Sequence, residues 1–67
     1  MEKIVVWKEF RDFRATTEEN YNARIMDLNK VWEFNHTENY ETFDDVVDTI
    51  EKWFNVDRKD IIIKKGE

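Results

Sequence analysis

The residues of this chain whose types and spacing could do chemistry are six carboxylates in its middle third. They are Glu38, Glu41, Asp44, Asp45, Asp48 and Glu51. Residues 31–55 contain seven acidic residues and one lysine, while the whole chain has a net charge of −5, so nearly all the acidity is local. Carboxylates can transfer protons, bind hard cations or attract a basic partner. We name these six residues the acidic surface and take them as the candidate partner-binding site.

Catalysis is the first of these chemistries to consider. A nucleophile needs a base beside it, and the chain has one histidine, His36, with no serine and no cysteine. Acid–base work by paired carboxylates requires one raised pKa, which usually means burial in an apolar pocket. Asp44 and Asp48 lie one helical turn apart on the face expected to be most hydrated. We therefore predict that the protein is not an enzyme and has no catalytic residue.

Metal and cofactor binding are also not favoured by the sequence. Three carboxylates on one exposed helix face rarely converge on a cation without loop carbonyls. The single glycine, Gly66, lies at the C-terminal end, so the chain has no glycine-rich phosphate loop. We predict neither a metal ion nor a cofactor.

The basic residues offer an alternative in which the protein binds nucleic acid weakly. They fall in two groups near strand ends: Lys8, Arg11 and Arg14, and Arg58, Lys59, Lys64 and Lys65. If the two strands are neighbours, these groups could form one positive patch beside aromatic residues, as in single-strand binders. Lysines at strand ends also simply discourage edge-to-edge pairing, and the net charge of −5 makes direct nucleic-acid binding unfavourable.

The element that must position the acidic surface is a helix over residues 42–54. Its apolar residues recur at the spacing of one helical stripe: they are Phe43, Val46, Val47, Ile50, Trp53 and Phe54. Thr42 is a good N-cap, and Asp45 three residues later completes a capping box. Asn55 is suited to the left-handed conformation that ends helices, after which Val56 could pack back on the last turn.

Three segments read as strands. Residues 3–13 begin with β-branched residues and continue with alternating long side chains, which predicts one strand. Residues 31–35 alternate in the same way, and Ile61–Ile63 followed by two lysines predicts a short final strand. Pairing the final strand with the start of the chain buries the β-branched side chains of both.

Residues 16–30 are ambiguous. As a helix, Thr16 and Glu19 would form a capping box ahead of a narrow apolar stripe. As a strand, residues 16–20 would form a hairpin turn, with Tyr21, Ala23 and Ile25 on one face. The sequence leaves both readings open, with a slight preference for the helix.

The predicted fold is α+β: a small, mainly antiparallel sheet of three to four short strands, crossed by the helix at 42–54, with a second helix open at 17–29. Residues 1–67 make one small domain with no linker. The ten aromatic residues could build a monomeric core or leave a patch for a second subunit, so a homo-oligomer stays open. No stretch reads as a membrane span or signal peptide, and cysteine is absent, so we expect a cytoplasmic protein.

In size, acidity and its order of strand, strand, helix, strand, the chain resembles the small inhibitors that bacteriophages make against host enzymes and defence systems. This resemblance implies a non-enzymatic interaction protein whose acidic surface mimics nucleic acid and blocks a basic site on a nucleic-acid-handling enzyme. The alternative is a small accessory domain that self-associates through exposed aromatics such as Trp7 or Trp32. A solvated helix face that only keeps the protein soluble would show the same charges.

Overall fold

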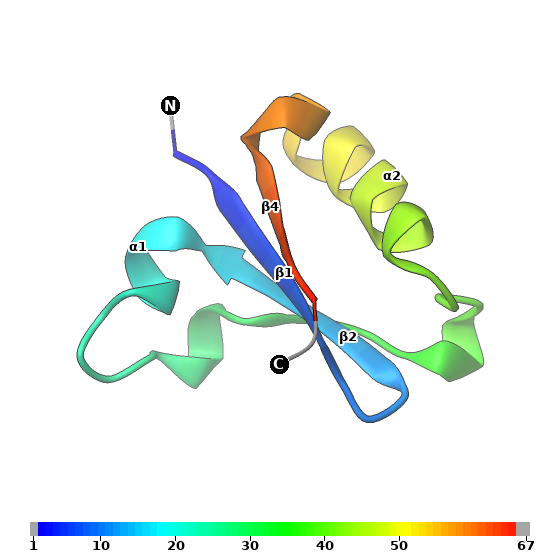
Figure 1. Cartoon of the computed structure of the whole chain (residues 1–67), viewed down its shortest axis with the longest axis horizontal. Helices are drawn as coiled ribbons and strands as arrows, with labels where there is room; N and C mark the ends of the chain where they lie inside the picture. The colour runs from blue at the N-terminus through cyan, green and yellow to red at the C-terminus, as the bar shows by residue number, and fades with distance from the viewer. Residues whose placement is uncertain (1, 66–67) are drawn as a thin grey trace.

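A four-stranded mixed sheet with one long helix across it forms the molecule (Figure 1). The computed structural model describes residues 2–65. Its strands are β1 (Ile4–Glu9), β2 (Asp12–Thr17), β3 (Trp32–Phe34) and β4 (Ile61–Lys64), and its helices are α1 (Glu18–Tyr21) and α2 (Phe43–Phe54). The strand order is β3-β2-β1-β4, with β1 antiparallel to β2, β2 antiparallel to β3, and β4 parallel to β1. This confirms the predicted α+β class.

Residues 3–13 form a hairpin, so the prediction of one strand over this segment is wrong. The chain turns at Phe10 and Arg11, and Glu9 pairs with Asp12. The usual sequence signal of a tight hairpin is glycine or asparagine, because at least one turn residue has positive φ. Here Phe10 takes that position, with φ of 59°, and its ring is almost fully exposed. A bulky residue at such a position hides the turn from sequence analysis.

Helix α2 has the bounds and both ends predicted for it. Thr42 accepts a hydrogen bond from the Asp45 amide, and the Asp45 carboxylate accepts one from the Thr42 amide, which completes the capping box. Asn55 is left-handed, with φ of 53°, and Val56 then packs against the core. Trp53 departs from its predicted core position, because it is 61% exposed at the edge of the apolar stripe.

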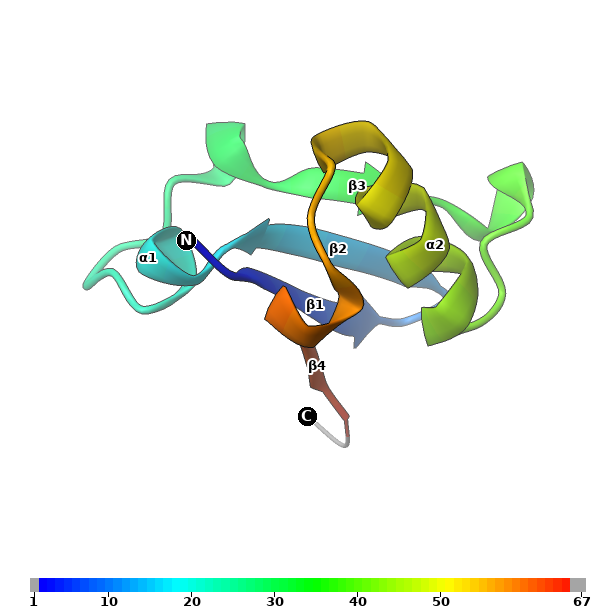
Figure 2. The same cartoon turned by 90° about the horizontal axis from the view of Figure 1, so that it is seen from above.

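The core lies between α2 and one face of the sheet. Side chains alternate along a strand, so every second residue points to the helix. The buried members of this layer are Ile4, Val6, Phe13, Ala15, Phe34, Val46, Val47, Ile50 and Ile61. Figure 2 shows α2 above this face and the strands in order from β3 to β4. The opposite face of the sheet, which we name the helix-free face, has no comparable helix over it.

Residues 17–29 contain a short helix, so the helical reading is correct for Glu18–Tyr21 alone and the strand reading is wrong. Helix α1 ends after four residues, and a bend leads to a 3-10 turn at Leu28–Lys30. The N-cap of α1 is Thr17, whose side chain accepts from the Asn20 amide; Thr16, the predicted cap, is buried in β2. This segment folds along the helix-free face instead of extending the sheet.

The two remaining strand predictions are confirmed. Trp32–Phe34 forms β3, within the predicted range 31–35, and Ile61–Lys64 forms β4. Ile61 lies beside Ile4, and Ile63 beside Val6, so the β-branched start and end of the chain do pair. The parallel direction follows from the connection, because the chain returns through α2 before it enters β4.

Candidate functional site on the helix-free face

The six residues of the acidic surface lie on α2 and on the loop before it. Glu38 ends a 3-10 turn at His36–Glu38, and Glu41 precedes the helix cap. Both side chains are exposed. Asp44 and Asp48 are exposed on α2, whereas the side chain of Glu51 is only 34% exposed. The structure thus places all six at or near the surface.

Arg58 lies against three of these carboxylates. Its guanidinium contacts Asp48, lies 3.5 Å from an Asp44 oxygen, and lies 3.3 Å from a Glu51 oxygen. The left-handed turn at Asn55 brings the chain back along α2, and Arg58 follows three residues later. Sequence analysis grouped Arg58 with the basic residues at the C-terminal end. The structure instead places its charge inside the acidic surface, where a basic partner would compete with it.

Asp45 has a structural role in the same region. Its Oδ2 accepts hydrogen bonds from the backbone amides of Glu41, at 3.2 Å, and Thr42, at 3.1 Å. These bonds, that from Glu41 first, lower the pKa of Asp45 below its ordinary value because they stabilise the ionised carboxylate. A lowered pKa is the opposite of what a general acid needs.

His36 is part of a second surface contact. Asp12 Oδ1 accepts from the His36 backbone amide at 3.0 Å and lies 2.9 Å from His36 Nδ1. The side-chain hydrogen bond to His36 is the main cause that lowers the pKa of Asp12. The pair ties the start of β2 to the turn after β3, which gives the only histidine a structural contact.

β1 and β4 are neighbours, as the prediction of a positive patch required, but several residues of the two basic groups already have partners. Arg14 pairs with Glu9 at 3.2 Å, Arg58 lies among the carboxylates, and Lys59 lies 4.0 Å from Asp57. Lys8 and Lys64 lie over the rings of Phe13 and Tyr21. This arrangement gives little support to nucleic-acid binding through the strand ends.

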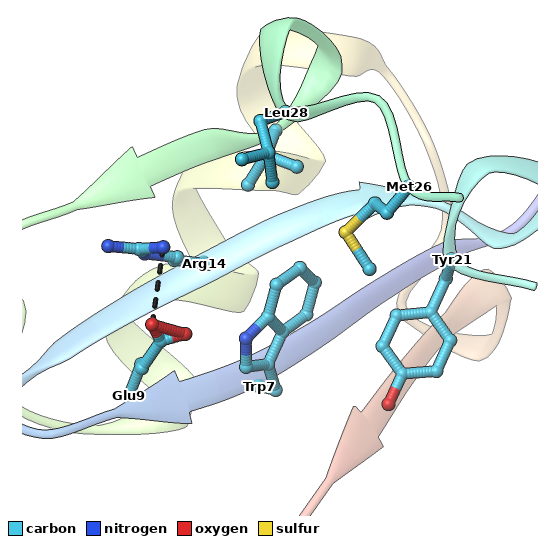
Figure 3. A pocket seen from close by; sticks show the side chains of 7 residues that line it. Trp7, Glu9, Arg14, Tyr21, Met26 and Leu28 are labelled. Carbon is cyan, nitrogen blue, oxygen red and sulfur yellow. Dashed lines mark ion pairs between the residues drawn. The ribbon is translucent and has the colours of Figure 1, made fainter.

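The described residues form a groove on the helix-free face. Its volume is about 470 Å³. It is lined by Trp7, Glu9, Arg14, Tyr21, Met26, Leu28 and Val31 (Figure 3). Trp7 and Arg14 are directly paired across β1 and β2 and form its floor. The wall comes from α1 and from the segment that follows it.

The groove wall is held in place by Asn20, which is buried. Its side-chain amide donates to Thr16 Oγ1 at 2.8 Å and to the Asp27 carbonyl at 3.1 Å, and its oxygen accepts from the Asp27 amide at 3.0 Å. Thr16 in turn donates to the Lys30 carbonyl at 2.9 Å. These bonds fix residues 27–30 beside the sheet.

The chemistry of the groove is apolar with one polar end. The Trp7 and Tyr21 rings lie 5.4 Å apart at a tilt of 54°, and Leu28 is 73% exposed at the rim. At the polar end, Arg14 Nη1 contacts Glu9, while Arg14 Nε is buried and has no hydrogen-bond partner within residues 2–65. Binding sites commonly combine an apolar lining with a few directed donors.

Sequence analysis missed this groove as a site. Trp7 was singled out only as an exposed aromatic, and Arg14 only as a basic residue. A signal for the groove was Met26, an apolar residue that breaks the helical stripe through Ile25 and Leu28. Such residues outside regular elements can only pack locally or remain exposed.

Two kinds of feature were not found among residues 2–65: a cluster of metal-ligating side chains and a membrane-spanning helix. Among residues 2–65 no group of three histidine or carboxylate side chains is placed to hold a metal ion. No helix in the same range is long and apolar enough to cross a membrane.

Comparisons with protein-family models, with curated proteins and with solved structures gave no match for this chain. The class is therefore defined by the structure itself. It is a small α+β protein with a mixed four-stranded sheet, one face of which is covered by α2 and the other of which carries an aromatic groove.

Proposed function

We propose that this protein is a non-enzymatic binding protein and that the groove on its helix-free face receives a segment of a protein partner. The observation that carries the proposal is the combination of a hollow of about 470 Å³, an exposed apolar rim and one polar end formed by Arg14 and Glu9. An apolar side chain of the partner lies against Trp7, Tyr21 and Leu28. A polar group of the same segment contacts the outer part of the Arg14 guanidinium, whose side chain is 34% exposed.

The expected free energies favour a segment of a protein partner over a single ion as the ligand of the groove. Burial of one large apolar side chain contributes about 1.5–3 kcal/mol. The Arg14 guanidinium is already neutralised by Glu9, so a free anion would gain little. Partner binding would therefore be driven mainly by apolar contact and would depend weakly on salt.

The test compares two exposed apolar residues of one loop. Leu28→Glu places a charge at the groove rim, whereas Ile25→Glu alters a residue that is 85% exposed and outside the groove. Each variant and the wild type are immobilised, and the proteins retained from a lysate are quantified by mass spectrometry. We expect at least one protein to be retained by wild type and Ile25→Glu but lost by Leu28→Glu. If every captured protein is retained in equal amounts by the two variants, the groove is not the binding site.

The acidic surface remains a second candidate, as a mimic of nucleic acid that blocks a basic site on a nucleic-acid-handling enzyme. It is supported by the charge segregation, since Lys52 is the one lysine or arginine in residues 31–55 and, among the described residues, Arg58 alone pairs with these carboxylates. Glu38 and Glu41 are its freest members, because their side chains form no ion pair within the described residues. A cytoplasmic setting, consistent with the absence of cysteine, belongs to the same proposal.

The two candidates are separated by charge reversal and by salt. Glu38→Lys with Glu41→Lys changes the charge by four units without disturbing the helix cap or Arg58. A partner of the acidic surface is lost from this double variant and from wild type at high salt, while a partner of the groove is kept in both. Retention of all captured proteins by the double variant would exclude the acidic surface.

A further inference from the structure

Strand β4 is an open edge of the sheet with an unusual composition. It pairs with β1 on one side, and in Figure 2 no described helix or strand lies beyond it on the other. Its residues are three isoleucines and a lysine. Open edges normally carry charges, prolines or bulges that prevent pairing with another chain. The other edge, β3, is better protected because it has three residues, includes Glu33, and lies between two 3-10 turns.

We propose that β4 is a dimerisation edge, at which a second copy of this chain pairs antiparallel through β4 and joins the two sheets into one of eight strands. The proposal is independent of the groove and of its partner. It commits to one register, with Ile62 on the two-fold axis.

Symmetry limits the registers that two copies can adopt. Along an edge strand, every second residue directs its backbone amide and carbonyl toward the free edge. In an antiparallel pair, such a residue of one strand must lie opposite such a residue of the other strand. Two-fold symmetry satisfies this condition only when one residue lies opposite its own copy. The candidates within the apolar part of β4 are therefore axes through Ile61, Ile62 or Ile63.

Side-chain chemistry selects among the three. An axis through Ile61 places Ile63 opposite Lys59, and an axis through Ile63 places Ile61 opposite Lys65. With the axis through Ile62, Ile61 meets Ile63 and Ile62 meets itself, so each of the three isoleucines faces an isoleucine. Pairs of β-branched residues across strands are favourable.

Charge complementarity favours the same register. With Ile62 on the axis, Lys64 of each copy comes level with Asp60 of the other, just before β4 begins. Lys65 comes level with Lys59, which would place two positive charges opposite each other. Lys59 lies outside the paired strands, however, and its side chain is 79% exposed and 4.0 Å from Asp57, so it can remain hydrated. The lysine that would protect a solitary edge thus gains an opposite charge in the dimer.

The first experiment measures the mass of the full chain by sedimentation velocity over a wide concentration range. Wild type is expected to shift from monomer to dimer. Ile62→Lys places two ammonium groups face to face on the axis and should remain monomeric, while Ile25→Lys, at an exposed site away from β4, should dimerise like wild type. Monomeric wild type at the highest concentration, or dimeric Ile62→Lys, would overturn the proposal.

A charge exchange tests the register without altering an isoleucine. Lys64→Glu or Asp60→Lys alone places two charges of the same sign opposite each other at both symmetry-related pairs of the dimer. Either variant should raise the dissociation constant of the dimer about tenfold. The double variant restores both pairs and should recover the wild-type dissociation constant. Failure of the double variant to recover would exclude this register.

Cross-linking provides a direct readout, because the chain has no cysteine of its own. Ile62→Cys places the two sulfurs opposite each other on the axis, so mild oxidation should convert it to a covalent dimer. Ile25→Cys serves as the control for random collision. Equal cross-linking rates for the two variants would contradict the proposed interface.

Discussion

At the scale of single residues, Phe10 combines two features that stability alone does not explain. Its φ of 59° is unfavourable for a residue with a bulky side chain, and its ring is 96% exposed, so burial does not offset the cost. Positive φ costs a non-glycine residue about 1–2 kcal/mol.

We therefore predict that Phe10→Gly raises the free energy of unfolding by about 1 kcal/mol, since glycine adopts positive φ freely but loses more chain entropy. Urea denaturation measures the change. Arg11→Gly is the matched control, because Arg11 belongs to the same turn but is not among the described residues with positive φ. It should lower the stability. An equal gain in both variants would mean that Phe10 is not strained.

Asp12 and Asp45 give the stability a dependence on acid. Hydrogen bonds to His36 lower the pKa of Asp12, and those to Glu41 and Thr42 lower that of Asp45, below an ordinary 3.8. Their contribution is complete above that value and is lost as the pH falls through the lowered pKa. Asp12→Asn and Asp45→Asn should be less stable than wild type near neutrality, with the difference closing in acid. Urea midpoints from neutrality to about pH 2 measure this. A difference that stays constant with pH would contradict it.

The candidate site was only partly accessible from the sequence. The exposure of Asp44 and Asp48 was predicted from a helical wheel, which depends on local spacing alone. The position of Arg58 among these acids depends on how the chain returns after Asn55, and spacing does not encode that return.

At the scale of elements, α2 was predicted with both ends because its stripe, cap and stop are contiguous in sequence. The β1–β2 hairpin was missed because Phe10 replaces the usual turn residue. The segment after α1 was missed because its shape depends on bonds between distant residues, such as Thr16 with the Lys30 carbonyl. Local signals predict local elements, whereas this loop is fixed by tertiary contacts.

Asn20 provides a test at this scale, because its side chain bonds both the amide and the carbonyl of Asp27. Asn20→Ala should destabilise the protein by about 1–3 kcal/mol and release the groove wall. Hydrogen exchange should show faster exchange of the Asp27 amide with little change in β1. Asn22→Ala, an exposed site in the same segment, should leave the Asp27 amide protected. Unchanged protection in Asn20→Ala would show that other contacts hold the loop.

At the scale of the whole molecule, the size of the core limits what any change can cost. A domain of 67 residues has a total stability of roughly 3–10 kcal/mol. Phe34 is fully buried, and its ring lies 5.1 Å from that of Tyr40 and 5.7 Å from that of Trp53. It therefore connects β3 to α2 and to the loop before it.

Phe34→Ala should cost about 3–5 kcal/mol, which is comparable with the whole stability, so this variant should be largely unfolded at physiological temperature. Phe34→Leu keeps most of the volume and should remain folded with a lower melting temperature. Thermal melts followed by circular dichroism distinguish the two.

If dimerisation through β4 occurs only in the folded state, the Phe34→Leu melting temperature should rise with protein concentration. The same rise should be absent when Ile62→Lys is combined with Phe34→Leu. Ile62→Lys prevents dimerisation, so the folded state no longer gains stability from it, while α2 and β3 are unchanged. If the melting temperature of the combined variant still rose with protein concentration, the chains would associate through a surface other than β4.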